Sequence, residues 1–240
     1  MKEPIRVAVA QPLVVSHDVA TNARHHAAAI REAGARLVVF PELSLTGYEL
    51  DAPAVDIEDP RLQPIVEACT AMGSIALVGA PVAVGARYIA MLAVEHMGAR
   101  IVYRKMWLGG DEPTKFSSGT APAVIEVDGW RFGLAICRDT RIEQHAADTA
   151  ALGMDAYVGG ITEAADQANA PGERARRVAA AHHVWVAIAS FTGATGGGFD
   201  ATAGHSGIWS PTGEAVTEAA HEVGAIISAT FHPRRAEEWA

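Results

Sequence analysis

Four side chains of this sequence could together carry out covalent catalysis at a carbon atom bonded to nitrogen. Cys137 supplies a nucleophile of the kind that attacks an acyl or nitrile carbon. Such a cysteine needs a base that takes its proton, a donor that holds the developing negative charge, and a base that later activates water. Glu42, Lys105 and Glu112 offer these roles. Residue type alone is weak support, so the elements that position these side chains decide between catalysis and a solvated surface.

Both Cys137 and Glu42 are expected just past the ends of buried strands. An apolar run over residues 132–136 stops at Cys137, and another over 37–40 is cut off by Pro41 and Glu42. Reacting groups of α/β proteins collect outside the carboxyl ends of strands, so one sheet edge is expected to bring the two side chains together. Arg138 and the backbone N–H after the cysteine are expected to favour its thiolate form.

The rest of the chain predicts alternating helices and strands with several hairpins. Residues 109–119 form a polar loop before the cysteine strand and are expected to make a wall of the site. The order of elements predicts an α/β fold with mixed sheets, in a single domain over 1–240. Helices are expected over 18–34, 62–72, 142–152 and 172–183, and strands over 6–11, 37–40, 75–81, 88–95, 100–103, 132–136, 155–158, 184–189 and 225–229.

Composition points to a small-molecule partner. The 240-residue chain carries a net charge of -9, and no stretch concentrates positive charge as a nucleic-acid or anionic-membrane surface would require. No apolar run approaches the ~18 residues of a membrane span, and no signal-peptide pattern opens the sequence. The two cysteines, Cys69 and Cys137, cannot form a disulfide framework. We therefore expect a cytoplasmic protein, with Cys69 in the core.

Three further patterns are interpreted as structural. The glycine-rich stretch 193–198 follows a strand, but no helix follows it to bind a phosphate. Residues 204–207 (GHSG) are one residue short of a serine-hydrolase elbow and precede a strand. The histidine pairs at 25–26 and 182–183 lie on expected helices, where neighbours point about 100° apart and do not readily share a metal. These histidines are therefore expected to be solvated or partly packed. No metal and no cofactor are expected.

Four ordered motifs resemble those of the nitrilase superfamily, the carbon-nitrogen hydrolases, in its amidase-like branch. Residues 40–48 (FPELSLTGY) resemble the glutamate motif of that family, 103–108 (YRKMWL) its lysine motif and 133–141 (GLAICRDTR) its cysteine motif. Residues 112–119 (EPTKFSSG) are similar to the loop that carries its second glutamate. Gln11 and the stretches 174–190 and 204–213 also match, so the resemblance covers almost the whole chain.

The resemblance implies a four-layer α-β-β-α sandwich that commonly forms a homodimer or a larger homo-oligomer. It also implies that Glu42 is the general base, that Lys105 stabilises the tetrahedral oxyanion and that Cys137 is the nucleophile. Glu112 would position the substrate or assist proton transfer. The implied activity is hydrolysis of a small linear amide or N-carbamoyl compound, with release of ammonia through a thioester. Three alternatives stay open: a nitrile hydrolase, a catalytically silent relative that binds a metabolite or a partner protein, and an unrelated nucleotide-binding protein.

Two departures from the family pattern bear on the substrate. The position after the cysteine is often aromatic or small and polar in the family, whereas this chain has Arg138. Arg138 and Arg141 could bind a substrate carboxylate in a bidentate manner, or they could pair with Asp139 or Glu143. Residues 191–193 (FTG) replace an asparagine-led loop, so that wall of the pocket is expected to be unusual.

Overall fold

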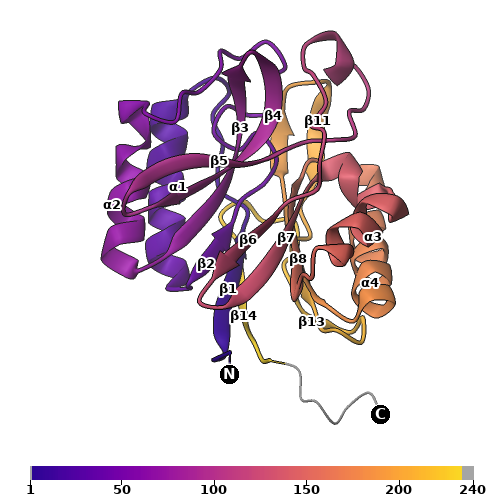
Figure 1. The fold of residues 1–240 in the computed structure, drawn as a ribbon. Helices are drawn as coiled ribbons and strands as arrows, with labels where there is room; N and C mark the ends of the chain where they lie inside the picture. The colour runs from indigo at the N-terminus through magenta and orange to yellow at the C-terminus, as the bar shows by residue number, and fades with distance from the viewer. Residues whose placement is uncertain (1, 234–240) are drawn as a thin grey trace.

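Two six-stranded sheets face each other between two pairs of helices in the computed structural model, which describes residues 2–233 (Figure 1). This arrangement confirms the predicted α-β-β-α sandwich with mixed sheets. The first sheet has the strand order β14-β1-β2-β3-β4-β5 and the second β13-β12-β9-β8-β7-β6. In each sheet three central strands run parallel, β1 to β3 and β7 to β9, and the outer strands pair antiparallel.

The observed elements follow the predicted ranges closely. The helices are α1 (Val19–Ala33), α2 (Gln63–Met72), α3 (Glu143–Ala151) and α4 (Ala170–His182). The strands of the first sheet are β1 (Ile5–Ala10), β2 (Leu37–Val39), β3 (Ile75–Val84), β4 (Ala86–Glu95), β5 (Gly98–Arg104) and β14 (Ile226–Phe231). Those of the second are β6 (Val124–Val127), β7 (Trp130–Ile136), β8 (Ala156–Ile161), β9 (Trp185–Ser190), β12 (Gly207–Trp209) and β13 (Ala215–Glu218).

Side chains of the central strands alternate between two buried layers, as the period of a strand requires. In β1, Val7 and Val9 enter the core between the sheets, while Ala8 packs under α1 and α2. In β7, Phe132, Leu134 and Ile136 face the first sheet. Ala135 points to the opposite side, under α3 and α4. A strand that is buried on both faces has apolar residues at successive positions. This is why the runs at 37–40 and 132–136 could be recognised as strands from the sequence.

A small hairpin was not predicted. The glycine-rich stretch 193–198, for which no secondary structure was predicted, forms part of the hairpin of β10 (Thr192–Thr195) and β11 (Phe199–Ala203). The hairpin lies at the same end of the molecule as the loop over 109–119 (Figure 1). A Cβ atom on residue 197 would lie 2.7 Å from the Tyr48 ring. Because Gly197 has no Cβ atom, the hairpin can approach residue 48 closely.

Two glycines of facing sheets enclose the segment that carries Glu42. A Cβ atom on Gly79 of β3 would lie 2.3 Å from the Leu43 nitrogen, and one on Gly160 of β8 would lie 2.4 Å from the Phe40 oxygen. The chain after β2 thus passes between the sheets with no room for even a methyl group on either side. No helix within residues 2–233 is long and apolar enough to cross a membrane.

We expect Gly160→Ala to destabilise the protein by about 1–3 kcal/mol, since the added methyl overpacks this crossing. Activity should fall as well, because the displaced backbone carries Glu42. Thermal unfolding and turnover of the purified variant measure both effects. The matched control is Gly172→Ala in α4, where a Cβ atom would meet its nearest neighbours at an ordinary 3.5 Å. Equal stability of Gly160→Ala and wild type would contradict the tight crossing.

Candidate active site

Cys137 lies directly after β7 and opens a short 3-10 helix over Cys137–Arg141. Its φ of 44° is in the left-handed region, which costs a non-glycine residue of the order of 1 kcal/mol or more. The Sγ atom donates a hydrogen bond to the Thr162 carbonyl oxygen at 3.3 Å, just past the end of β8. The strained turn therefore holds the thiol at the carboxyl end of its strand, where the sequence placed it.

Glu42 is brought to Cys137 from the other sheet. It follows β2 of the first sheet, and its side chain interacts with the thiol of Cys137, which follows β7 of the second. The expectation that one sheet edge holds both residues is therefore wrong, because the site lies between two facing sheets. Glu42 is 1% exposed, and its Oε2 atom has no hydrogen-bond partner among residues 2–233. This oxygen is available to accept a proton.

Lys105 joins the two glutamates. Its Nζ atom, on a side chain 1% exposed, donates to Glu42 Oε1 and to Glu112 Oε1, both at 2.6 Å. Glu112 is itself held by the Tyr48 hydroxyl at 2.6 Å and by the Gly109 N–H at 2.8 Å. Buried ions are tolerated only when they are paired and hydrogen-bonded. The structure therefore brings Glu42, Lys105, Glu112 and Cys137 together, as the resemblance implied.

The charges of this cluster set the protonation of the site. Burial raises the pKa of Glu42 to about 7, although the Lys105 ammonium opposes this rise. Burial also acts to lower the pKa of Lys105, but the neighbouring Glu42, Cys137 and Glu112 outweigh it and raise that pKa. Burial, followed by the charge of Glu42, raises the pKa of the Cys137 thiol to about 12. Both shifts favour a protonated thiol beside Glu42 in the resting site, in contrast to the predicted thiolate.

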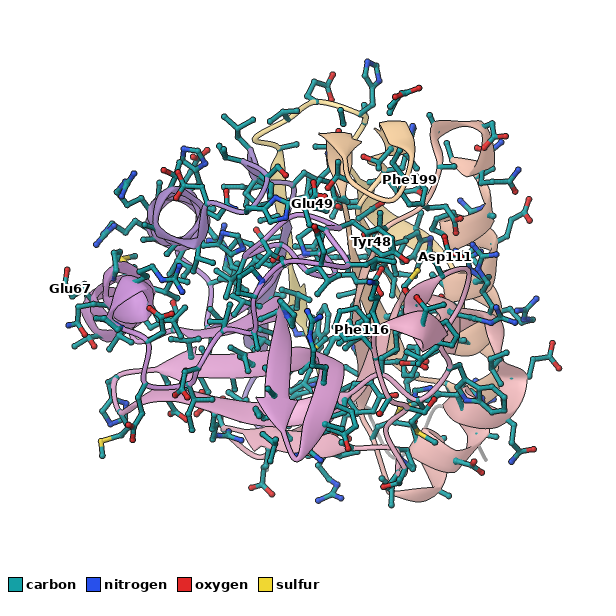
Figure 2. All side chains as sticks on the ribbon, turned by 90° about the horizontal axis from the view of Figure 1, so that it is seen from above. Tyr48, Glu49, Glu67, Asp111, Phe116 and Phe199 are labelled. Carbon is teal, nitrogen blue, oxygen red and sulfur yellow. The ribbon has the colours of Figure 1, made fainter. Side chains whose placement is uncertain are left out.

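A cavity of about 280 Å³ opens onto Cys137, Lys105 and Glu112. Seen from above, Tyr48, Asp111 and Phe199 lie close together over the middle of the molecule, and all three line this cavity (Figure 2). The loop over 109–119 contributes a wall, as was expected, and the β10–β11 hairpin contributes another through Gly197 and Phe199. Residues 191–193, which were also expected to form a wall, are not among the lining residues. The full lining consists of Tyr48, Leu50, Lys105, Gly109, Gly110, Asp111, Glu112, Cys137, Arg138, Arg141, Thr162, Glu163, Gly197 and Phe199.

The two arginines after the cysteine have different surroundings. Arg141 lines the cavity, but its Nη2 atom pairs with Glu163 Oε1 at 2.5 Å. Arg174 of α4 binds the other oxygen of Glu163 at 2.6 Å. Arg138 is exposed, lines the same cavity and forms no ion pair within the described part of the chain. Sequence reasoning missed Glu163, since nothing near it marks a buried acid that binds two arginines.

Asp139 connects the lysine segment to the cysteine turn. Its Oδ1 atom accepts the Trp107 N–H at 2.9 Å. Its Oδ2 atom accepts the Ile136 N–H at 3.0 Å and the Tyr103 hydroxyl at 2.8 Å. Tyr103 and Trp107 flank Lys105 by two residues, while Ile136 immediately precedes Cys137. This fully buried carboxylate therefore fixes the position of the lysine relative to the nucleophile.

The histidines lie outside the catalytic cluster. His26 is fully buried and bonds to the Asn22 carbonyl oxygen and to Ser44, so the expectation of a solvated or partly packed side chain is wrong for this residue. Within residues 2–233, one group could hold a metal: His17, Glu49 and Asp51, near the surface. None of the three lines the cavity, and His17 already pairs with Asp51. This group gives no support for a metal in the reaction.

A model of the family described as carbon-nitrogen hydrolase matches residues 6–240. The chain belongs to this family. Among curated proteins, this chain is 33% identical over 162 residues to a hydrolase encoded in the pqqF 5' region of Pseudomonas protegens. It is 29% identical over 127 residues to an (R)-stereoselective amidase of a Pseudomonas species. These matches cover 63% and 51% of this chain, and 57% and 46% of the relatives, so they span about half the length of those proteins.

Solved structures of the nitrilase superfamily share the fold of this chain. A mutant amidase from Nesterenkonia AN1 superposes with a TM-score of 0.84 at 21% identity, over 95% of this chain and 90% of that one. A superfamily member from Xanthomonas campestris, with an arsenic adduct in its active site, gives 0.86 at 18% identity, over 96% and 91%. The family and the fold are thus shown by independent matches. The roles of the individual site residues stay predictions.

We expect Asp139→Asn to lower the free energy of unfolding of the protein by about 1–3 kcal/mol. The asparagine has one acceptor oxygen for three donors, so its NH₂ group must face an N–H or the Tyr103 hydroxyl. Turnover per folded molecule should fall at least roughly 10-fold, because Lys105 and Cys137 lose their fixed geometry. Urea unfolding and steady-state kinetics measure the two effects. Asp148→Asn on the exposed face of α3 is the control, and equal behaviour of both variants would contradict the positioning role.

Proposed function

We propose that this carbon-nitrogen hydrolase cleaves small linear amides or N-carbamoyl compounds through a thioester on Cys137. The observation that carries the proposal is the buried cluster of Glu42, Lys105 and Glu112 beside that thiol. Lys105 neutralises one oxygen of Glu42, whose other oxygen has no hydrogen-bond partner within the described chain. A base with a pKa of about 7, next to a protonated thiol, is suited to proton transfer near neutral pH.

In the first half of the reaction, the Cys137 sulfur attacks the amide carbon while the thiol proton moves to Glu42. The carbonyl oxygen becomes an oxyanion, and the Lys105 ammonium stabilises it as a nearby cation and donor. Collapse of this intermediate breaks the C–N bond, and Glu42 returns the proton to the nitrogen, so that ammonia leaves. The product on the enzyme is a thioester of Cys137.

In the second half, water replaces the departed nitrogen. Glu42 takes a proton from this water as its oxygen attacks the thioester carbon, and Lys105 again stabilises the oxyanion. The C–S bond breaks, the sulfur recovers the proton and the acid leaves. Glu112 accepts a second hydrogen bond from Lys105 and thereby holds the ammonium beside Glu42. No step requires a metal or a cofactor.

Amides are favoured over nitriles as substrates because both the curated relative with a stated reaction and the Nesterenkonia structure are amidases. A catalytically silent protein would have no need of a buried ion cluster beside a thiol, since such a cluster is costly to desolvate. The homodimer or larger assembly implied by the resemblance, and the cytoplasmic location, stay predictions.

Cys137→Ala should abolish ammonia release from a panel of short amides and N-carbamoyl amino acids. With wild type, added hydroxylamine should trap the acyl group as a hydroxamate, since it attacks the thioester in place of water. Cys69→Ala is the matched control, because Cys69 is buried in α2 and is expected to have no part in the reaction. Turnover by Cys137→Ala, or the absence of hydroxamate from a substrate that wild type hydrolyses, would overturn the mechanism.

The rate of acylation should depend on the ionisation of Glu42. As the pH falls through about 7, Glu42 is protonated and can no longer accept the thiol proton, so kcat/KM should decrease about tenfold per pH unit well below that pKa. Profiles of kcat/KM from pH 5 to 8 test this. Glu42→Gln should be very slow and should lose this pH dependence. A flat wild-type profile across pH 7 would mean that another group is the base.

A further inference from the structure

Arg138 is a cation of the cavity wall that no acid of the described chain neutralises. Three cationic side chains line the cavity: Lys105, Arg138 and Arg141. Lys105 binds two carboxylates, and Arg141 is paired with Glu163. Within residues 2–233 the Arg138 side chain has neither an ion pair nor a hydrogen bond. A positive charge therefore faces the space beside the nucleophile without a protein counter-ion.

The backbone of the neighbouring loop is fitted to this arginine. A Cβ atom on Gly109 would lie 3.2 Å from both Cδ and Nη1 of Arg138, so the guanidinium lies close over a glycine that makes room for it. The same Gly109 donates its N–H to Glu112, which holds Lys105. Arg138 is thus kept near the reacting groups through the loop that forms the catalytic cluster, although its side chain is exposed.

Neighbouring charges limit what this arginine can bind. Glu163 occupies both Arg141 and Arg174, so those two guanidinium groups are not available to a ligand. Asp111 also lines the cavity and has no cationic partner within the described residues. Because Asp111 is an acid on the same wall, it repels a second negative charge. The wall therefore offers one free cation and disfavours dianions.

We propose that Arg138 is an anion-binding subsite and that the preferred substrates are short amides with a single carboxylate on the acyl part. This inference rests on the proposed function for the position of the amide at Cys137. The planar guanidinium binds a carboxylate through two parallel hydrogen bonds, which fixes the direction of the acyl chain. The substrate carboxylate then replaces the counter-ion that the protein does not supply.

The kinetic test compares two amides of equal chain length, butanamide and succinamate, which carry a methyl and a carboxylate at the far end. Wild type should prefer succinamate in kcat/KM. Arg138→Gln should lower kcat/KM for succinamate by roughly 10-fold or more, mainly through KM, and should lower kcat/KM for butanamide much less, so that the ratio of the two values falls. The kcat/KM of Arg138→Lys for succinamate should fall between the values of wild type and Arg138→Gln. Asp111→Asn should improve succinamate, and higher salt should weaken the preference because it screens exposed charges.

A binding test separates this inference from the proposed function. Succinamate and butanamide are titrated calorimetrically into Cys137→Ala and into Cys137→Ala with Arg138→Gln. If Cys137→Ala binds succinamate more tightly than butanamide and the added Arg138→Gln removes this difference, the subsite is supported. If wild type then hydrolyses neither amide, only the proposed function fails. The subsite is overturned if wild type and Arg138→Gln show the same ratio of kcat/KM for the two amides, or if succinamate does not bind. Arg31→Gln on the exposed side of α1 is the control for loss of one positive charge.

Discussion

The buried ammonium of Lys105, shared between Glu42 and Glu112, is the interaction on which the rest of the site depends. Removing three ions from water is costly, and the cost is offset only because both carboxylates lie 2.6 Å from the same nitrogen. The two carboxylates and the single ammonium leave a net negative charge beside Cys137. Together with burial, this charge keeps the thiol protonated and raises the pKa of Glu42 towards neutrality. The same contacts that stabilise the cluster therefore place a carboxylate with a pKa near neutrality beside the thiol.

This cluster exists because two sheets deliver its members from opposite sides. Glu42 and Lys105 follow β2 and β5 of the first sheet, whereas Cys137 follows β7 of the second. The sheets can approach at this point because Gly79 and Gly160 leave space for the chain that carries Glu42. Close backbone packing between the sheets thus determines how near Glu42 lies to Cys137.

Two buried acids outside the reaction hold the site in place by binding backbone and arginine donors. Asp139 joins the lysine segment to the cysteine turn, and its partner Tyr103 continues to His145, at 2.8 Å, so the contact extends into α3. Glu163 joins the end of that turn to α4 through Arg141 and Arg174. Both carboxylates are therefore occupied by hydrogen-bond donors of the protein itself. Among the three cationic side chains that line the cavity, Arg138 alone has no partner within the described chain, and the proposed subsite rests on this difference.

The sequence by itself predicted the strand ends and the catalytic candidates, and its resemblance to the nitrilase superfamily implied the four layers. Apolar runs that stop at Glu42 and Cys137 are local signals, since strand periodicity and chain breakers act over a few residues. Tertiary structure alone decided that the two residues come from different sheets, that the thiol rests protonated, and that Arg141 is neutralised while Arg138 is not. Each of these depends on groups far apart in the chain, such as Glu42 with Lys105, 63 residues away, or Arg141 with Glu163, 22 residues away. Burial and counter-ions are properties of the folded arrangement, and no spacing in the sequence encodes them.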